Sequence, residues 1–113
     1  MGCLFCNIVA GKTPARVVLD EEDVLAFHDV HPVASTHVLV IPKRHIASLN
    51  EATEVDAELL GKVLVAARRV AELEGVAESG YRTVFNNGRD ANQTVDHLHL
   101  HVIGGRMMKW PPG

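Results

Sequence analysis

Three histidines alternate with aliphatic residues near the C-terminus, in the segment 97–102, which reads HLHLHV. On a β-strand, a period of two places the three imidazoles on one face and the three aliphatic side chains on the other. Alternate residues lie roughly 6.6 Å apart along a strand, so one small ligand can meet at least two of the rings. The pattern therefore predicts a histidine row (His97, His99 and His101) on a strand over residues 97–103.

Two chemistries suit such a row. Three histidines could hold a zinc ion whose bound hydroxide attacks the substrate, as in metal-assisted hydrolysis. Alternatively, neutral His99 could itself be the nucleophile, with its neighbours positioning the substrate and supplying protons. Imidazole suits this role because its pKa lies near neutral pH, and one ring nitrogen can attack while a hydrogen bond holds the other. The spacing alone does not choose between the two.

The length of the chain predicts one domain over residues 1–113. With 47% hydrophobic and 22% charged residues, the composition is typical of a soluble globular protein. A net charge of -3 argues against a broad nucleic-acid or membrane surface. The longest apolar runs, such as 38–41 and 63–67, are too short to span a bilayer. The first residues lack the basic and apolar regions of a secretory signal, so we expect a cytoplasmic protein.

The elements that must position the histidines follow from periodicity. Strands are expected at 17–19, 24–28, 37–41, 81–85 and 97–103, each bounded by turn residues. One long helix is expected from an N-cap at Thr53, with Asp56 as its capping partner, to Gly75, because apolar residues recur there at helical spacing. The result is an antiparallel α+β domain with the helix against one face of the sheet.

Residues 93–106, QTVDHLHLHVIGGR, resemble the signature of the histidine triad (HIT) superfamily. The segment 110–113, WPPG, is similar to the tail of its HINT-like branch of purine nucleoside phosphoramidases. Segments 26–30 (AFHDV) and 36–46 (THVLVIPKRHI) match two further family blocks. The resemblance implies a single HIT domain with an antiparallel sheet of about five strands and one long helix, the sheet being extended across a homodimer.

By that resemblance, the activity is hydrolysis of the P–N bond of adenosine or guanosine 5′-monophosphoramidates through a nucleotidyl-histidine on His99. The alternatives are a dinucleoside polyphosphate hydrolase of the same superfamily and a nucleotide-binding regulatory protein. His101 would bind the phosphate and assist the leaving group, His97 would orient the row, and His37 would join its proton network. The nucleotide would be held at the phosphate by Thr94 and the backbone around Asn92 and Gln93, near the sugar by Asp29 and Asn86, and at the purine by Phe5, Ile8, Phe27 and Val30.

Two departures from the family pattern stand out. The family usually has glycines where this chain has Ala91 and Asn92, and asparagine tolerates the left-handed conformation that a close approach to phosphate can require. Asp96 replaces an aromatic or apolar residue, and on a strand its carboxylate would share the face of Leu98 and Leu100.

Cys3 and Cys6 have the spacing of half a zinc site. In some bacterial histidine triad proteins, and in the related hexose-phosphate uridylyltransferases, such a pair joins histidines at the positions of His45 and His97. The resemblance therefore implies a structural zinc on Cys3, Cys6, His45 and His97, tethering the N-terminus to the catalytic strand. Catalysis should not require this metal, because other HINT-like members lack the cysteines.

Overall fold

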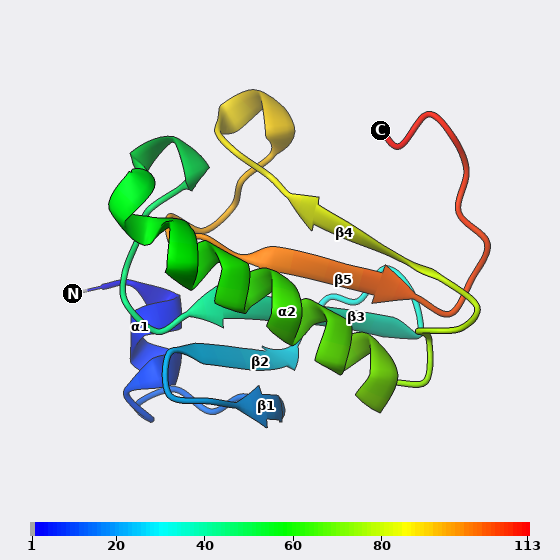
Figure 1. Cartoon of the computed structure of the whole chain (residues 1–113), viewed down its shortest axis with the longest axis horizontal. Coiled ribbons are helices and arrows are strands. Elements are labelled where there is room, and N and C mark those ends of the chain that lie inside the picture. The colour runs from blue at the N-terminus through cyan, green and yellow to red at the C-terminus, as the bar shows by residue number, and fades with distance from the viewer. Residues whose placement is uncertain (1) are drawn as a thin grey trace.

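The computed structural model describes residues 2–113, in which five strands form one antiparallel sheet (Figure 1). The strands are β1 (Val17–Asp20), β2 (Val24–His28), β3 (Thr36–Pro42), β4 (Tyr81–Phe85) and β5 (Leu100–Gly104). Their order across the sheet is β1-β2-β3-β5-β4, and every neighbouring pair is antiparallel. β3 is central and buried along its whole length, whereas β1 and β4 form the two edges.

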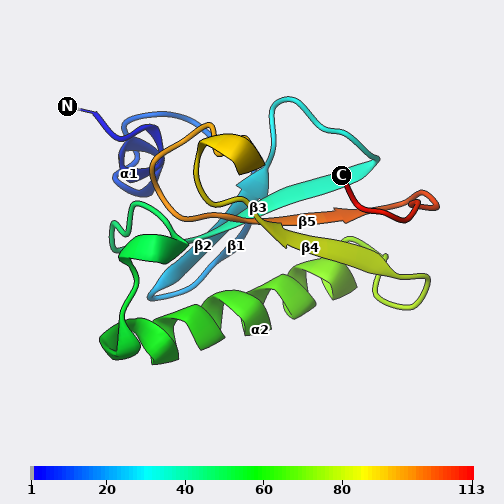
Figure 2. The same cartoon turned by 90° about the horizontal axis from the view of Figure 1, so that it is seen from above.

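The long helix α2 (Ala57–Leu73) covers one face of the sheet (Figure 2). Its buried side chains, from Val63 to Val70, pack on the inward-facing residues of β2, β3 and β5 in the main core cluster. Because side chains alternate along a strand, the other residues of β2 and β3 must face away from α2.

The helix begins and ends close to where the sequence predicted. Residues Glu54–Asp56 form a turn of 3-10 helix, and the Thr53 N–H donates to the Asp56 carboxylate across 2.9 Å, as expected for a capping pair. Gly75 has a φ of 76° directly after the final turn, a left-handed position that favours glycine. The α+β architecture, with a five-strand antiparallel sheet and one long helix, is confirmed.

The opposite face carries a short helix, α1 (Leu4–Val9), and the connection between β4 and β5 (Figure 2). Phe5 of α1 packs there with the outward residues of β2 and β3, which form a second buried cluster of Leu25, Phe27, Leu39 and Ile41. No periodic signal marks α1 in the sequence, because six residues are fewer than two turns. This face holds the histidines.

The predicted strand at 97–103 is wrong at its start, since β5 begins at Leu100. Residues 97–99 leave the strand ladder: the Leu98 N–H donates to the Ile46 carbonyl across 2.6 Å. The histidine row is therefore broken between His97 and the two later histidines.

Among residues 2–113, no helix is both long and apolar enough to cross a membrane.

Candidate functional site

A cavity of about 430 Å³ opens on the face that carries α1. Eight of the residues predicted to hold a nucleotide line it: Phe5, Ile8, Phe27, Asp29, Val30, Thr94, His99 and His101. Sequence reasoning missed the rest of the lining, namely Leu4, residues 13–16, His28, His31, Leu39 and Val95. Two further hollows, of about 460 and 640 Å³, contain no histidine.

One end of the cavity is apolar. Phe5 and Phe27 are each 4% exposed, and their rings meet edge to face with centroids 5.4 Å apart. Val30 is 84% exposed at the rim, so it is available to a ligand and does not belong to the core. A flat ring of a ligand would find apolar carbon on several sides here, which is the usual lining of a small-molecule site.

His99 lies at the polar end, and a main-chain group fixes its tautomer. Its Nδ1 lies 2.7 Å from the His97 carbonyl oxygen, which can only accept, so Nδ1 carries the proton. In the neutral tautomer that this contact selects, the lone pair lies on Nε2. The ring is 5% exposed and stands edge to face against Phe5, with centroids 5.2 Å apart. A neutral imidazole with one nitrogen held and the other free is arranged as a nucleophile.

A chain of hydrogen bonds orients His101. The Val33 N–H donates to His37 Nδ1 across 3.1 Å, which leaves the His37 proton on Nε2. That nitrogen lies 2.9 Å from His101 Nδ1 and 3.3 Å from an Asp29 carboxylate oxygen. His101 Nδ1 is thus an acceptor, and the His101 proton lies on Nε2. The Asn86 side-chain amide lies beside this nitrogen, with Nδ2 3.4 Å from His101 Nε2. Because Nδ2 also donates, a hydrogen bond from His101 Nε2 requires the Asn86 amide to turn its oxygen toward the ring.

The same contacts argue against a metal ion held by Asp29, His37 and His101, although their donor atoms are close together. To bind an ion through Nε2, His37 would need its proton on Nδ1. That proton would then face the Val33 N–H, placing two donors against each other. The group is better described as a proton relay.

Burial keeps the two histidine rings of this relay uncharged. Burial lowers the pKa of His37, with the Asp29 carboxylate acting in the opposite direction. Burial, reinforced by the His99 and His37 rings, lowers the pKa of His101 to about 4, again opposed by Asp29. At neutral pH both rings can therefore donate from Nε2 without carrying a charge.

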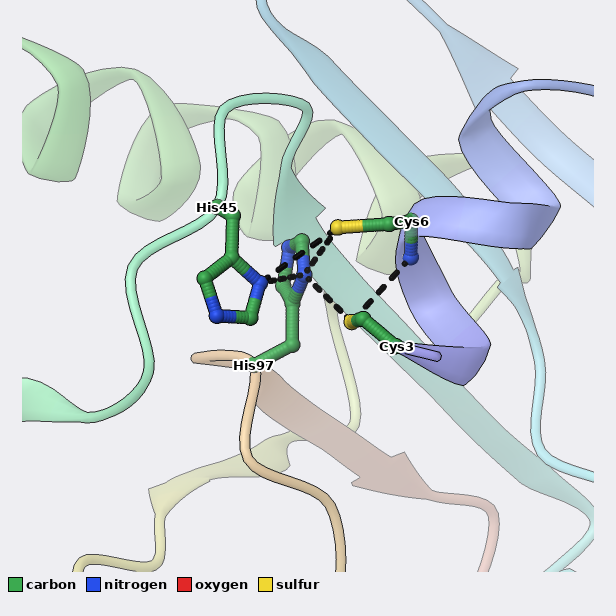
Figure 3. A group of neighbouring side chains, drawn as sticks. All are labelled: Cys3, Cys6, His45 and His97. Atoms are coloured by element: carbon green, nitrogen blue, oxygen red, sulfur yellow. Dashed lines mark hydrogen bonds between the residues drawn. The ribbon is translucent and has the colours of Figure 1, made fainter. Parts of the chain in front are cut away.

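His97 does not point along the row, which corrects the sequence-based expectation. Its ring turns toward the two cysteines and His45 (Figure 3). His97 Nε2 lies 2.8 Å from the Pro42 carbonyl oxygen and so carries the proton, leaving the Nδ1 lone pair directed at the cluster. Any orienting effect of His97 on the row therefore acts through its main-chain carbonyl on His99 and not through its imidazole.

The donor atoms of Cys3, Cys6, His45 and His97 are spaced as a tetrahedral metal site requires. His97 Nδ1 lies 3.3 Å from Cys3 Sγ, 3.6 Å from Cys6 Sγ and 3.2 Å from His45 Nδ1. Cys6 Sγ lies 3.4 Å from His45 Nδ1. Ordinary zinc–sulfur and zinc–nitrogen bonds set separations of about 3.3 to 3.8 Å between tetrahedral ligands. The bond from His97 to Pro42 is the kind of outer contact that fixes a metal-binding histidine.

The loop before the histidines is braced by Gln93. Its side chain donates to the carbonyls of Ala47 and Val95, at 2.9 and 3.0 Å, and accepts from the Gly88 N–H at 3.0 Å. Asn92 takes up the left-handed conformation, with a φ of 61°, as its residue type allows.

The backbone donors differ from those predicted. The N–H groups of Asn92 and Gln93 are already bonded to the carbonyls of Arg89 and Gly88. Within residues 2–113 the N–H groups of Thr94 and Val95 have no such partner, and both residues line the cavity, so these amides are candidate donors to a ligand there. Asp96 is exposed in the bend before β5, so the expectation based on strand faces does not apply to it.

Comparisons with known proteins agree on one family. Residues 10–108 match the HIT domain family. The chain is 48% identical over 110 residues to an uncharacterized HIT-like protein of Synechococcus elongatus, covering 97% of this chain and 96% of the relative. A crystal structure of a HIT family hydrolase from Legionella pneumophila Philadelphia 1 superposes with a TM-score of 0.97 at 50% identity, over 99% of this chain and 100% of the other. A histidine triad nucleotide-binding protein from Candida albicans superposes with a TM-score of 0.84 at 31% identity, over 97% of this chain and 83% of the other.

Proposed function

The chain belongs to the HIT domain family, and we propose that it hydrolyses the P–N bond of purine nucleoside 5′-monophosphoramidates with His99 as the nucleophile. The observation that carries this proposal is the Nε2 of His99, which the bond from Nδ1 to the His97 carbonyl leaves without a partner in a ring that lines the cavity. The solved relatives described as a hydrolase and a nucleotide-binding protein support the class of reaction.

The proposed reaction has two steps. His99 Nε2 attacks the α-phosphorus while the P–N bond breaks, and the departing amine takes up a proton that solvent supplies through His101 Nε2. Water then hydrolyses the nucleotidyl-histidine and returns one proton, so the cycle consumes none. The free N–H groups of Thr94 and Val95 donate to the phosphate oxygens as their charge develops.

The cavity suits a nucleotide in its volume and in the polarity of its lining. The apolar end, with Phe5, Ile8 and Phe27, would hold the purine, and Val30 would cover it from the rim. Asp29 lines the cavity, with a carboxylate oxygen 3.3 Å from His37 Nε2, and would accept from the ribose hydroxyls. Its Oδ1 already accepts from the His31 N–H across 2.8 Å, which fixes the carboxylate.

A nucleophilic histidine is favoured over a metal-bound hydroxide. The three-histidine zinc site requires the rings at positions 97, 99 and 101 to converge, whereas the His97 ring turns away to the cysteines. The Nε2 of His99 is then the candidate nucleophile whose ring is both held by the main chain and part of the cavity lining.

We further propose that Cys3, Cys6, His45 and His97 hold a structural zinc ion, because their four donor atoms have tetrahedral spacing. An ion there would link the N-terminal segment to the residues before β5 and supply no step of the reaction.

A homodimer that joins two sheets through their β4 edges is also proposed. β4 is an edge strand, and open edges are natural pairing surfaces. Met107 and Trp110, in the C-terminal segment that follows β5, are 90% and 81% exposed. Light scattering on the purified protein tests this: a dimer mass supports it, and a monomer at micromolar concentration contradicts it.

Substrate comparison separates the proposed activity from its alternatives. We expect kcat/KM for adenosine 5′-monophosphoramidate to exceed that for a diadenosine polyphosphate by at least about tenfold, a difference of ~1.4 kcal/mol in transition-state stabilisation. The reverse ranking would favour the polyphosphate hydrolase. Tight nucleotide binding without turnover of either substrate would favour a regulatory protein.

A further inference from the structure

Helix α1 forms one wall of the cavity, and its own hydrogen bonds are too few to hold it there without packing or a tether. It has six residues, and so short a helix is unstable on its own in water. Leu4, Phe5 and Ile8 of α1 all line the cavity. Only Phe5 among them is buried, and it packs on Phe27. The position of this wall therefore depends on how α1 is attached to the rest of the protein.

The two cysteines lie at the start of this helix. Cys3 is its N-cap, and the Cys6 N–H donates to Cys3 Sγ across 3.3 Å. The two other donors come from separate segments: His45 follows β3, and His97 precedes β5 (Figure 3). A ligand set drawn from these places ties the first turn of α1 to the segment that carries His99.

Phe5 connects the two sites directly. Its ring lies edge to face against the rings of both His97 and His99, with centroids 5.9 and 5.2 Å apart. One neighbour belongs to the four-residue cluster, and the other is the proposed nucleophile. Movement of α1 would therefore displace an aromatic side chain that lines the cavity.

We infer that the cluster of Cys3, Cys6, His45 and His97 sets the affinity of the protein for the nucleobase, because metal bound there fixes α1 and its aromatic wall. The four residues are positioning residues in this role, since none of them is among the residues that line the cavity. The inference rests on the proposed function and deepens it by assigning the metal site a part in substrate recognition.

The loss of affinity on metal removal should be confined to recognition of the base. Stacking of a base on an aromatic side chain typically changes affinity by roughly 5- to 150-fold. The phosphate end is built from β5 and the loop before it, and these segments are held by the sheet and by Gln93. Loosening α1 should then weaken a ligand with a base by about tenfold and leave a ligand without one nearly unchanged.

The inference is tested by comparing a ligand that has a base with one that lacks it, on the same protein. Dissociation constants of AMP and of ribose 5-phosphate are measured by NMR titration, first with one equivalent of Zn²⁺ bound and then after removal by a chelator. We expect the affinity ratio of AMP to ribose 5-phosphate to fall by about tenfold on metal removal, with less than a twofold change for ribose 5-phosphate. The amides of Asn7 and Ala10, bonded to the carbonyls of Cys3 and Cys6, should exchange faster with deuterium.

A variant controls for the possibility that the protein unfolds when the chelator removes zinc. His45→Gln removes a ligand from an exposed loop outside the cavity and should reproduce the fall in the ratio at limiting Zn²⁺. Lys43→Gln, two residues away, breaks only a surface ion pair with Asp20 and is the matched control that keeps the ratio.

Several results would overturn the inference. An affinity ratio of AMP to ribose 5-phosphate that stays the same on metal removal would overturn it, whether both affinities stay constant or fall together. Failure to bind one equivalent of Zn²⁺ would also do so. If the loaded protein binds neither ligand, the proposed nucleotide function fails as well, so the two failures are distinguishable.

Discussion

The neutrality of His101 makes a quantitative prediction about acid stability. Its pKa in the folded protein is lowered to about 4, chiefly by burial, whereas a histidine in an unfolded chain titrates near 6.5. Between these values the unfolded chain binds a proton at this residue and the folded protein does not. The free energy of unfolding therefore falls as pH decreases from 6.5 toward 4, and is fully recovered above 6.5.

The magnitude follows from the two pKa values. Lowering the pH from 7.5 to 5.0 should cost about 2 kcal/mol at this residue if the whole shift is effective. Because the ring is only partly buried, solvent screening reduces the expected loss to roughly 1 to 2 kcal/mol. His37, whose pKa burial also lowers, changes stability in the same direction.

Urea unfolding at several pH values measures this effect. The loss of stability between pH 7.5 and 5.0 should be smaller in His101→Gln than in the parent by roughly 1 to 2 kcal/mol. His31→Gln removes an exposed imidazole at the cavity rim and should lose as much stability as the parent. Equal losses in His101→Gln and the parent, or a parent that gains stability on acidification, would refute the reasoning.

Three further outcomes are expected. His99→Ala should lower turnover of a nucleoside phosphoramidate by about 10³-fold or more while AMP still binds; retained turnover would exclude the nucleophile. Asp29→Asn should raise KM about tenfold for a ribonucleotide but little for a 2′,3′-dideoxy analogue; equal effects on both would mean that Asp29 acts through His37. Chelation should leave kcat within about twofold while the protein stays folded, because no step passes through the metal; loss of kcat in the folded protein would favour a metal-bound hydroxide.

The sheet and the long helix could be predicted because their signals are local. Val24 to His28 and Tyr81 to Phe85 are bounded by turns at both ends, and the structure has strands at the same residues. The helix showed apolar residues at helical spacing over four turns, together with Thr53 at its start and Gly75 at its end. Such patterns carry most of the information about secondary structure.

The course of residues 97–99 could not be predicted from the alternation. A period of two describes a strand only while the backbone stays in the ladder, and here Leu98 bonds to the loop that follows β3. The His97 ring then joins the cysteines instead of the row. Long-range contacts of this kind leave no trace in local periodicity.

The contacts that hold the site in place could not be predicted from the sequence either. Helix α1 is too short to show a period, yet it forms a wall of the cavity. The occupied N–H groups of Asn92 and Gln93 depend on the turn that begins at Gly88. Residue types indicated which side chains could meet a nucleotide, but hydrogen-bond partners decide which backbone donors are free.

The central claim is that His99 becomes covalently bound to phosphorus. Mass spectrometry of enzyme quenched during turnover of adenosine 5′-monophosphoramidate tests it most directly. We expect a chain heavier by one adenylyl group, with the modification on the peptide that contains His99 and no adduct in His99→Ala. Turnover by the parent with no adduct under rapid quench, or an adduct on another residue, would contradict the account.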